Sequence, residues 1–212
     1  VLDRWCYNQY DACLNLGGIA NIGLALHETW MGWDLCGCNQ LLDYGASLLG
    51  YTFDEGESAA RTGKVNQYLL TELQSFSYLE QKPPKSLSNK EVADYAIHSR
   101  FIQSVKPVDL LATYTEHISM QIIQPVREFG LKRILVSGGG AKNTFLLESI
   151  KKYCPFLVIE VPEESMLAYK ECQLLSLMGL LNQLNMPNSF ASVTGALEDT
   201  VGGVWSNPKN YD

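Results

Sequence analysis

The sequence LNLGGIANI, residues 14 to 22, consists of two apolar segments separated by a pair of glycines. Apolar and β-branched residues that run up to turn-forming glycines are typical of strands joined by a tight turn. Residues 11–16 and 19–26 are therefore predicted strands, and residues 29–33 continue the pattern as a third.

Downstream of these strands, helical and extended patterns alternate. Apolar residues recur at three- and four-residue spacing in four predicted helices, residues 39–49, 111–129, 143–153 and 168–184. Short apolar segments predict two further strands, residues 133–137 and 156–161. In the last helix, the side expected to be buried consists of Leu174, Leu177, Met178 and Leu181.

Residues 51–90 interrupt this order, and Pro83-Pro84 excludes a continuous helix there, so we expect an insertion that carries a loop. The order is thus three strands, helix, insertion, helix, strand, helix, strand, helix. It predicts an α/β fold, a mixed sheet flanked by helices, in the ribonuclease-H-like pattern of an actin-type ATPase lobe. No repeat or Gly/Ser linker divides the chain, so residues 1–212 are expected to form one unit.

The composition argues against several classes of protein. A formal net charge of -7 and a pI near 5.0 argue against nucleic-acid binding, which needs clustered Lys and Arg. No apolar run approaches the ~20 residues that cross a bilayer, so we expect no membrane partner and a soluble, cytoplasmic protein. The six cysteines suit free thiols in a reducing compartment, and Cys36-x-Cys38 lacks the second pair that a zinc site needs. We therefore expect no metal-ligating residues.

The glycine pair Gly17-Gly18 allows two interpretations. Without a Cβ, neighbouring backbone N–H groups can point together at an anion, which suits a phosphate cradle. The same pair also fits an ordinary hairpin turn, which on spacing alone is the commoner case.

A carboxylate, Asp34, lies at the end of the third predicted strand, just before a glycine-containing helix entry. There it can accept a proton from water while oxygens of a ligand lie at the helix N-terminus, so Asp34 is the candidate general base. Its alternative role is to cap the turn or the helix. Asn39 has the same two interpretations, helix cap or ligand contact.

A third loop, Gly138-Gly139-Gly140, separates a predicted strand from a predicted helix. Three glycines allow the flat, close approach of a planar ligand such as adenine, and Asn143 can cap the helix or bond a ribose or phosphate. The loop matches neither the Walker A motif nor G-x-G-x-x-G. Nucleotide binding and a structural turn both remain open for it.

Seven motifs, in chain order, resemble those of the anhydro-N-acetylmuramic acid kinases. They are LNLGGIANI (14–22), GWDLCGCNQLLD (32–43), PPKS (83–86), LATYTEHI (111–118), VSGGGAKN (136–143), YKE (169–171) and SVTGA (192–196). The resemblance spans nearly all 212 residues, and seven motifs in order are far more specific than any one of them.

The resemblance implies a kinase with the sugar kinase/actin/Hsp70 fold. Such an enzyme opens the 1,6-anhydro ring of its amino sugar with water and phosphorylates O6, giving N-acetylmuramic acid 6-phosphate for cell-wall recycling. The cofactors implied are ATP and Mg²⁺, the substrate is a small anhydro amino sugar, and a homodimer is possible.

Matched to the motifs, the implied roles fall into three groups. The phosphate-binding group is Gly17, Gly18 and Asn21, with Asp34 as the catalytic base. The nucleotide-binding group is Gly138, Gly139, Gly140 and Asn143. The substrate-binding group is Asn39, Lys85, Ser86, Glu171 and Thr194. Several of these have plainer alternatives, since Glu171 also fits a surface glutamate, Lys85 a solvated loop and Thr194 the end of the fold.

Two departures from the family pattern stand out. Where the family has Thr-Gly-Pro-Gly-Asn after its catalytic Asp, this chain has residues 35–39, LCGCN, which lose a hydroxyl and shift the glycines. The amino-terminal lobe, with its Gly-Thr-Ser-x-x-Asp-Gly phosphate loop, is absent from this sequence. The chain also opens at Val1 without an initiator Met and is expected to enter a strand almost at once, as a fragment or processed product would.

A cleft between two lobes needs both walls, so we expect this piece alone to be inactive. The alternative to a kinase lobe is a non-catalytic nucleotide-binding or interaction module that keeps the lobe's fold.

Overall fold

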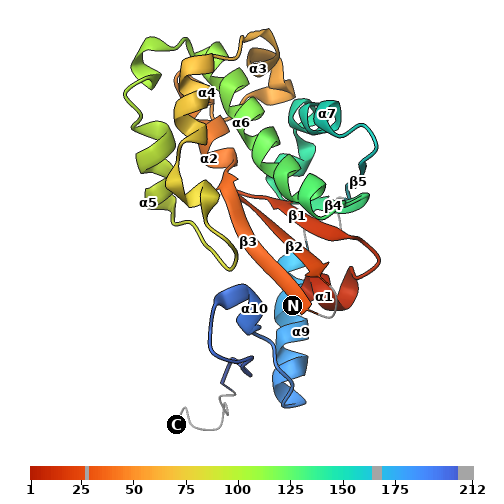
Figure 1. Ribbon diagram of the computed structural model, residues 1–212. Helices are drawn as coiled ribbons and strands as arrows, with labels where there is room; N and C mark the ends of the chain where they lie inside the picture. The colour runs from red at the N-terminus through yellow and green to blue at the C-terminus, as the bar shows by residue number, and fades with distance from the viewer. Residues whose placement is uncertain (27–28, 164–168, 205–212) are drawn as a thin grey trace, which may run out of the picture.

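The structure, a computed structural model, describes residues 1–26, 29–163 and 169–204. It confirms the predicted mixed sheet flanked by helices (Figure 1). Five strands lie in the order β3-β2-β1-β4-β5, with bounds β1 Ala12–Leu16, β2 Ile19–Leu26, β3 Thr29–Gly37, β4 Arg133–Ser137 and β5 Val158–Glu160. β1, β2 and β3 are antiparallel, whereas β4 is parallel to both β1 and β5. This is the predicted ribonuclease-H-like arrangement.

The helices follow the predicted order. The longer ones are α2 (Asn39–Ser47), α4 (Gln67–Gln74), α6 (Pro107–Glu128), α7 (Thr144–Tyr153) and α9 (Lys170–Gln183). The shorter ones are α1 (Leu2–Cys6), η1 (Glu55–Glu57), α3 (Ser58–Thr62), η2 (Ser77–Glu80), α5 (Asn89–Val92), η3 (Ala93–Ile97), η4 (Ile102–Ser104), η5 (Gly139–Lys142) and α10 (Ala191–Thr194). The insertion thus consists largely of short helices between α2 and α6.

The sheet separates two apolar layers. Alternate residues of a strand point to opposite faces, so Leu14 and Leu16 of β1 join the main core while Cys13 joins a smaller cluster. Helices α2 and α6 cover the first face, and α1 and α9 lie on the other (Figure 1). Within the smaller cluster, Leu2 of α1 and Leu174 of α9 pack with Cys13.

The central helix α6 has clear signals at both ends. Pro107 occupies its first turn, where a missing backbone N–H costs nothing, and Asp109 places a negative charge near the helix N-terminus. After its last turn, Gly130 adopts a φ of 63°, and the N–H of Leu131 donates to the carbonyl of Val126 at 2.9 Å. This glycine-dependent closure ends the helix where the sequence predicts it.

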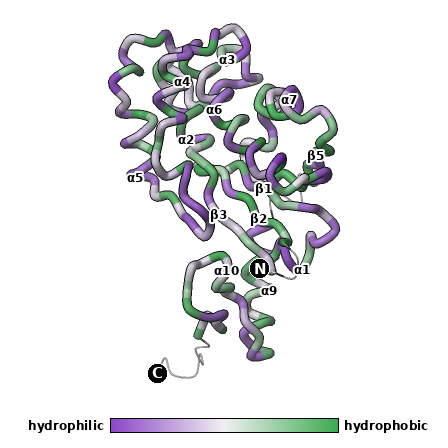
Figure 2. The backbone as a smooth tube through the Cα atoms, viewed as in Figure 1, coloured by the Kyte–Doolittle hydropathy of each residue, from purple (hydrophilic) through white to green (hydrophobic). Residues whose placement is uncertain are grey.

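The last long helix is less buried than the sequence predicts. Hydrophobic residues occur along α9 (Figure 2), yet of the four residues expected to be buried only Leu181 is. Leu175 and Leu180 are 69% and 52% exposed. The spacing of apolar residues shows which side of a helix is hydrophobic, but not whether other elements pack against that side. The predicted start of this helix, Ala168, lies outside the described residues.

One other prediction is wrong, because the chain begins in α1 and not in a strand. The loop after β4 includes the short η5, and α7 follows it where a helix is predicted. Four cysteines are buried free thiols, as predicted, but Cys6 and Cys172 are exposed. In the part of the chain that the structure describes, no helix is both long and apolar enough to cross a membrane.

A histidine, His117, is fully buried on α6. The amide of Gln121 donates to Oε1 of Gln74 at 2.7 Å, so the Gln74 Nε2 group faces Nδ1 of His117, 3.3 Å away, as a donor. The ring proton then lies on Nε2, which has no hydrogen-bond partner among the described residues. Because burial disfavours the charged form, it lowers the pKa of His117 from 6.5 to about 4.

We predict that His117 makes the stability of the fold sensitive to acid. Above pH 6.5 the His117 ring is neutral in both the folded and the unfolded chain. Between pH 6.5 and about 4, the ring is protonated in the unfolded chain but stays neutral in the folded chain. The free energy of unfolding should therefore fall by about 3 kcal/mol over that range because of His117 alone. In urea unfolding followed from pH 7 to pH 4, His117→Gln should flatten this loss, whereas His98→Gln, at an exposed histidine, should not. Equal acid sensitivity of wild type and His117→Gln would contradict the prediction.

Candidate active site

The turn between β1 and β2 is fastened to the start of α2. The carbonyl of Gly17 accepts from the N–H of Asn39 at 3.1 Å, and the carbonyl of Gly18 accepts from the N–H of Cys38 at 2.8 Å. Neither glycine has a φ in the left-handed region. Gly18 leaves room for the neighbouring Gln40 side chain, because a Cβ at Gly18 would lie only 3.2 Å from it. The hairpin is confirmed, and the phosphate cradle stays a prediction.

The glycines after β4 serve mainly to bring two loops together. Gly138 has a φ of 84°, and a Cβ there would lie 2.6 Å from Oδ1 of Asn15. A Cβ on Gly140 would lie 2.8 Å from that of Leu16. Only Gly139 is open, since its nearest neighbour would be the Asn39 amide at 3.5 Å. The absence of a side chain is therefore required at two of the three positions, Gly138 and Gly140, because the loop passes close to the end of β1 there.

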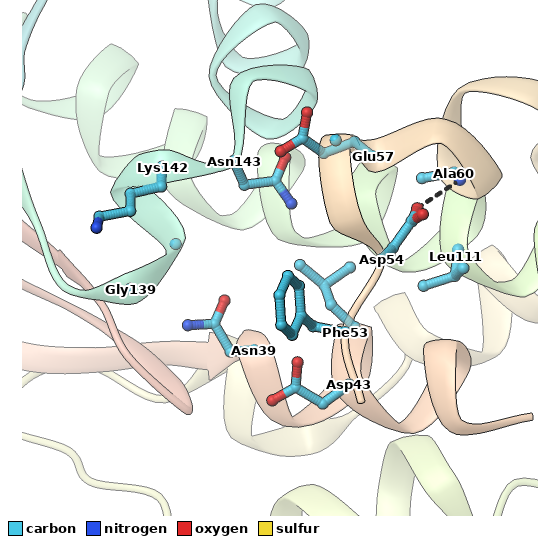
Figure 3. A pocket seen from close by; sticks show the side chains of 13 residues that line it. Asn39, Asp43, Phe53, Asp54, Glu57, Ala60, Leu111, Gly139, Lys142 and Asn143 are labelled. Carbon is cyan, nitrogen blue, oxygen red and sulfur yellow. Dashed lines mark hydrogen bonds between the residues drawn. The ribbon is translucent and has the colours of Figure 1, made fainter. Parts of the chain in front are cut away.

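A cavity of about 430 Å³ lies beside this glycine turn (Figure 3). Its lining comprises Asn39, Leu42, Asp43, Phe53, Asp54, Gly56, Glu57, Ala60, Leu111, Gly139, Gly140, Lys142 and Asn143. Asn143 caps α7, accepting from the N–H of Leu146 at 2.8 Å, and so fills the structural role predicted for it while also facing the cavity. Asn39 is the first residue of α2 rather than its cap, and its amide donates to the carbonyl of Leu16 at 3.1 Å.

Sequence reasoning missed the far wall of this cavity, which the insertion supplies. Figure 3 shows the Phe53 ring between the Gly139 side of the cavity and the Asp54 side. Both carboxylate oxygens of Asp54 accept from backbone N–H groups of α3, at 3.0 and 2.8 Å, so this residue holds the wall in place. Short helices of mixed composition carry no sequence signal for such a wall.

Two other acidic residues face the same cavity. Glu57 is buried and adopts a φ of 54°, a strained conformation for a residue with a side chain, while its Oε2 accepts from the Thr144 hydroxyl at 2.8 Å. On α2, partial burial raises the pKa of Asp43. The cavity thus combines an apolar floor with carboxylate acceptors, and phosphate groups would be repelled from that end.

Asp34 lies beside a different cavity, of about 240 Å³, on the other side of the site. Its Oδ2 accepts from the Ser86 hydroxyl at 3.0 Å and from the N–H of Leu87 at 2.8 Å. Asp34 therefore caps no helix but holds the loop that contains Ser86. Lys85 lines this cavity too, yet its ammonium turns inward and donates to the carbonyl of Tyr78 at 3.0 Å. The solvated-loop alternative for Lys85 is thus wrong, and burial lowers its pKa.

A row of polar residues crosses four neighbouring strands at this end of the sheet. Asp34 pairs with Asn21, Asn21 with Asn15, and Asn15 with Ser137. Residues paired in this way point to the same face, so the row lies on the face covered by α1 and α9. Ser137 accepts from the ammonium of Lys170 in α9 at 2.9 Å. We call Asp34, Asn21, Asn15 and Ser137 the polar row.

The remaining predicted residues lie at the rim. Glu171 lines a neighbouring cavity of about 340 Å³ together with Asn15, Asn21 and Gly138, but does not line the Asp34 cavity. Thr194 is exposed, and its hydroxyl donates to the carbonyl of Phe190 within its own helix. The neighbouring Val193 lines the Asp34 cavity instead.

Within the described residues, no three His, Cys, Asp or Glu side chains are arranged to hold a metal ion. The candidate site consists of two glycine turns, the polar row and three neighbouring cavities.

The strand order and the flanking helices give the fold of one lobe of the actin-type ATPases. The sequence profile of the anhydro-N-acetylmuramic acid kinase family matches residues 6–207, and the chain belongs to that family.

Curated relatives are similar over about half their length. The anhydro-N-acetylmuramic acid kinase of Cupriavidus pinatubonensis is 28% identical over 89% of this chain and 53% of its own. That of Synechococcus sp. strain ATCC 27144 is 30% identical over 92% of this chain and 57% of its own. The chain thus spans about half the length of the curated relatives it matches.

Among solved structures, the activator of 2-hydroxyisocaproyl-CoA dehydratase from Clostridium difficile, with bound ADPNP, gives a TM-score of 0.49. It is 16% identical, over 73% of this chain and 55% of that chain. The Acidaminococcus fermentans (R)-2-hydroxyglutaryl-CoA dehydratase component A gives a TM-score of 0.45 at 14% identity, over 81% of this chain and 61% of that chain.

The glycine turn offers a matched pair of substitutions. Gly138→Ala should lower the free energy of unfolding by about 2 kcal/mol or more, because the new Cβ meets β1 and the residue keeps a positive φ. Gly139→Ala should change it by less than about 0.5 kcal/mol, because its Cβ would make only an ordinary contact, 3.5 Å from the Asn39 amide. Urea denaturation at pH 7 measures both, and equal losses for the two variants would contradict the described turn.

Proposed function

We propose that the chain is the nucleotide-binding and base-carrying lobe of an ATP-dependent kinase that acts on 1,6-anhydro-N-acetylmuramic acid. In this reaction, water attacks C1 and the C1–O6 bond breaks, while O6 takes the γ-phosphoryl group of ATP. The products are N-acetylmuramic acid 6-phosphate and ADP, as cell-wall recycling in the cytoplasm would require. Family membership and the position of Asp34 on the polar row support the proposal.

Asp34 is the proposed general base. Its carboxylate borders the cavity proposed for the sugar, and its strand partner Asn21 borders both this cavity and the one beside Gly138. A base within reach of both an incoming water and the phosphate end of the nucleotide is what the proposed reaction needs. Asn21 and the backbone of Gly17 and Gly18 would face the phosphates.

The cavity beside Gly139 fits an adenosine group. Its volume of about 430 Å³ lies in the range of small-molecule sites. Leu42 and Leu111 supply an apolar floor for the base, and the carboxylates repel phosphate toward the glycine turns. In dinucleotide-binding folds an acidic residue hydrogen-bonds a ribose hydroxyl, and we propose that role for Glu57.

Mg²⁺ would enter with the nucleotide. This ion keeps several waters and is commonly held by substrate phosphates plus one or two carboxylates, so it requires no cage of protein ligands. Bound there, it would neutralise charge on the transferring phosphoryl group. On the sugar side, Ser86 borders the Asp34 cavity, whereas Glu171 and Thr194 lie outside it and would need a facing lobe to reach the same ligand.

The second candidate function is a non-catalytic nucleotide-binding module. The chain spans about half of its relatives' length, and a two-lobe cleft needs both walls to exclude water and hold two substrates. We therefore expect no turnover by residues 1–212 alone. A Gly-Thr-Ser-x-x-Asp-Gly segment encoded upstream of Val1 would favour the kinase.

Asp34→Asn tests the base in a protein that carries both lobes. The substitution should lower kcat at least 100-fold, in line with loss of a general base, while the Kd for ATP stays within about twofold. Phosphorylated sugar is measured by coupled ADP release and by mass spectrometry. Turnover like that of the wild type would refute the role of Asp34.

Glu57 can be tested by nucleotide binding alone. The folded chain should bind ATP about 10-fold more tightly than 2′-deoxy-ATP, because a hydrogen bond to a charged group contributes on the order of 1.5 kcal/mol. Glu57→Ala should remove most of this difference, whereas Glu55→Ala, an exposed neighbour, should preserve it. Calorimetric titration up to millimolar nucleotide provides the measurement. No preference for ATP in the wild type would refute the ribose contact.

A further inference from the structure

We propose that Ser86 is a positioning residue for Asp34. The Ser86 hydroxyl and the Leu87 amide both donate to Oδ2 of Asp34, which leaves Oδ1 of Asp34 to take the proton. The inference rests on the proposed function, and it changes the role predicted for Ser86 from substrate contact to support of the base. It also assigns the reacting atom within the Asp34 carboxylate.

The carboxylate of Asp34 is held asymmetrically. Both hydrogen bonds from described residues reach the same oxygen, Oδ2, one from the Ser86 hydroxyl at 3.0 Å and one from the Leu87 N–H at 2.8 Å. An oxygen that already accepts two hydrogen bonds is the poorer site for a further proton. Oδ1 is therefore the oxygen left to accept a proton from water.

The loop is fixed to β3 independently of the Ser86 hydroxyl. The N–H of Asp34 donates to the carbonyl of Lys85 at 3.3 Å, and the hydroxyl of Tyr78 donates to the carbonyl of Asp34 at 2.8 Å. Lys85 in turn donates to the carbonyl of Tyr78, and Leu87 is buried. Because several contacts determine the loop, Ser86→Ala should remove one hydrogen bond and leave the backbone in place.

The Ser86 hydroxyl cannot donate a hydrogen bond to a substrate while it donates to Asp34. A serine has a single O–H donor, and in this structure it points at Asp34. It could then only accept a hydrogen bond from a sugar. A substrate contact should be visible in KM, whereas support of the base should be visible in kcat.

The first experiment uses this chain without any activity. Asp34→Ala, Ser86→Ala and the double variant form a cycle of urea-unfolding measurements. The effect of the double substitution on the unfolding equilibrium constant should be smaller than the product of the two single effects. We expect the difference to be about threefold to tenfold, as for one hydrogen bond to a carboxylate. Ser88→Ala, in a capping box with Glu91, should combine additively with Asp34→Ala. Additive effects of Asp34→Ala and Ser86→Ala would overturn the proposal.

The second experiment uses a protein with both lobes. Ser86→Ala should lower kcat about 10-fold with KM for sugar and for ATP within twofold of wild type, and Ser86→Thr should restore most of kcat. A rise in KM for the sugar at unchanged kcat would overturn the positioning role in favour of substrate contact. If the wild type itself has no turnover, the proposed function fails, and the unfolding cycle alone decides whether Ser86 holds Asp34.

Discussion

The placement of β1 between an antiparallel and a parallel neighbour is the constraint on which the rest of the structure depends. One register links Asn15 to Asn21 on one side and to Ser137 on the other. A slip by one residue would turn every side chain of β1 to the opposite face. The polar row would then break and Leu14 would leave the main core. The same pairing that buries the core therefore aligns the polar groups at the end of the sheet.

Much of this arrangement could be predicted from sequence because it depends on local patterns. Short apolar segments mark the strands, and Gly130 and Asn143 mark a helix end and a helix start. Asp34 could be singled out because it follows an apolar segment and precedes a glycine-containing helix entry, although β3 continues past it to Gly37. The roles of individual glycines were harder to predict, since only the structure shows that Gly138 faces β1 while Gly139 faces a cavity.

The parts that sequence could not supply depend on contacts between distant segments. Phe53 lies just before η1 and Glu57 lies in it, in a segment whose composition resembles any polar surface, and only packing brings them to the same cavity as Asn143. The extent of burial of α9 could not be predicted either, because it too depends on contacts with distant segments. The spacing of Leu174, Leu177, Met178 and Leu181 predicts one buried side, but it does not show which other elements pack against that side, and only Leu181 is buried.

The hydrogen bonds between Asp34 and the loop at residues 85–87 also have a consequence for chain entropy. They fasten the long segment between α2 and α6 at residues 86 and 87, dividing one large loop into a longer and a shorter one. Closing a loop costs conformational entropy that grows with the logarithm of its length, so an internal attachment leaves each part with less freedom to lose. Asp34, the proposed general base, would thus also keep a long, irregular segment of the chain in order.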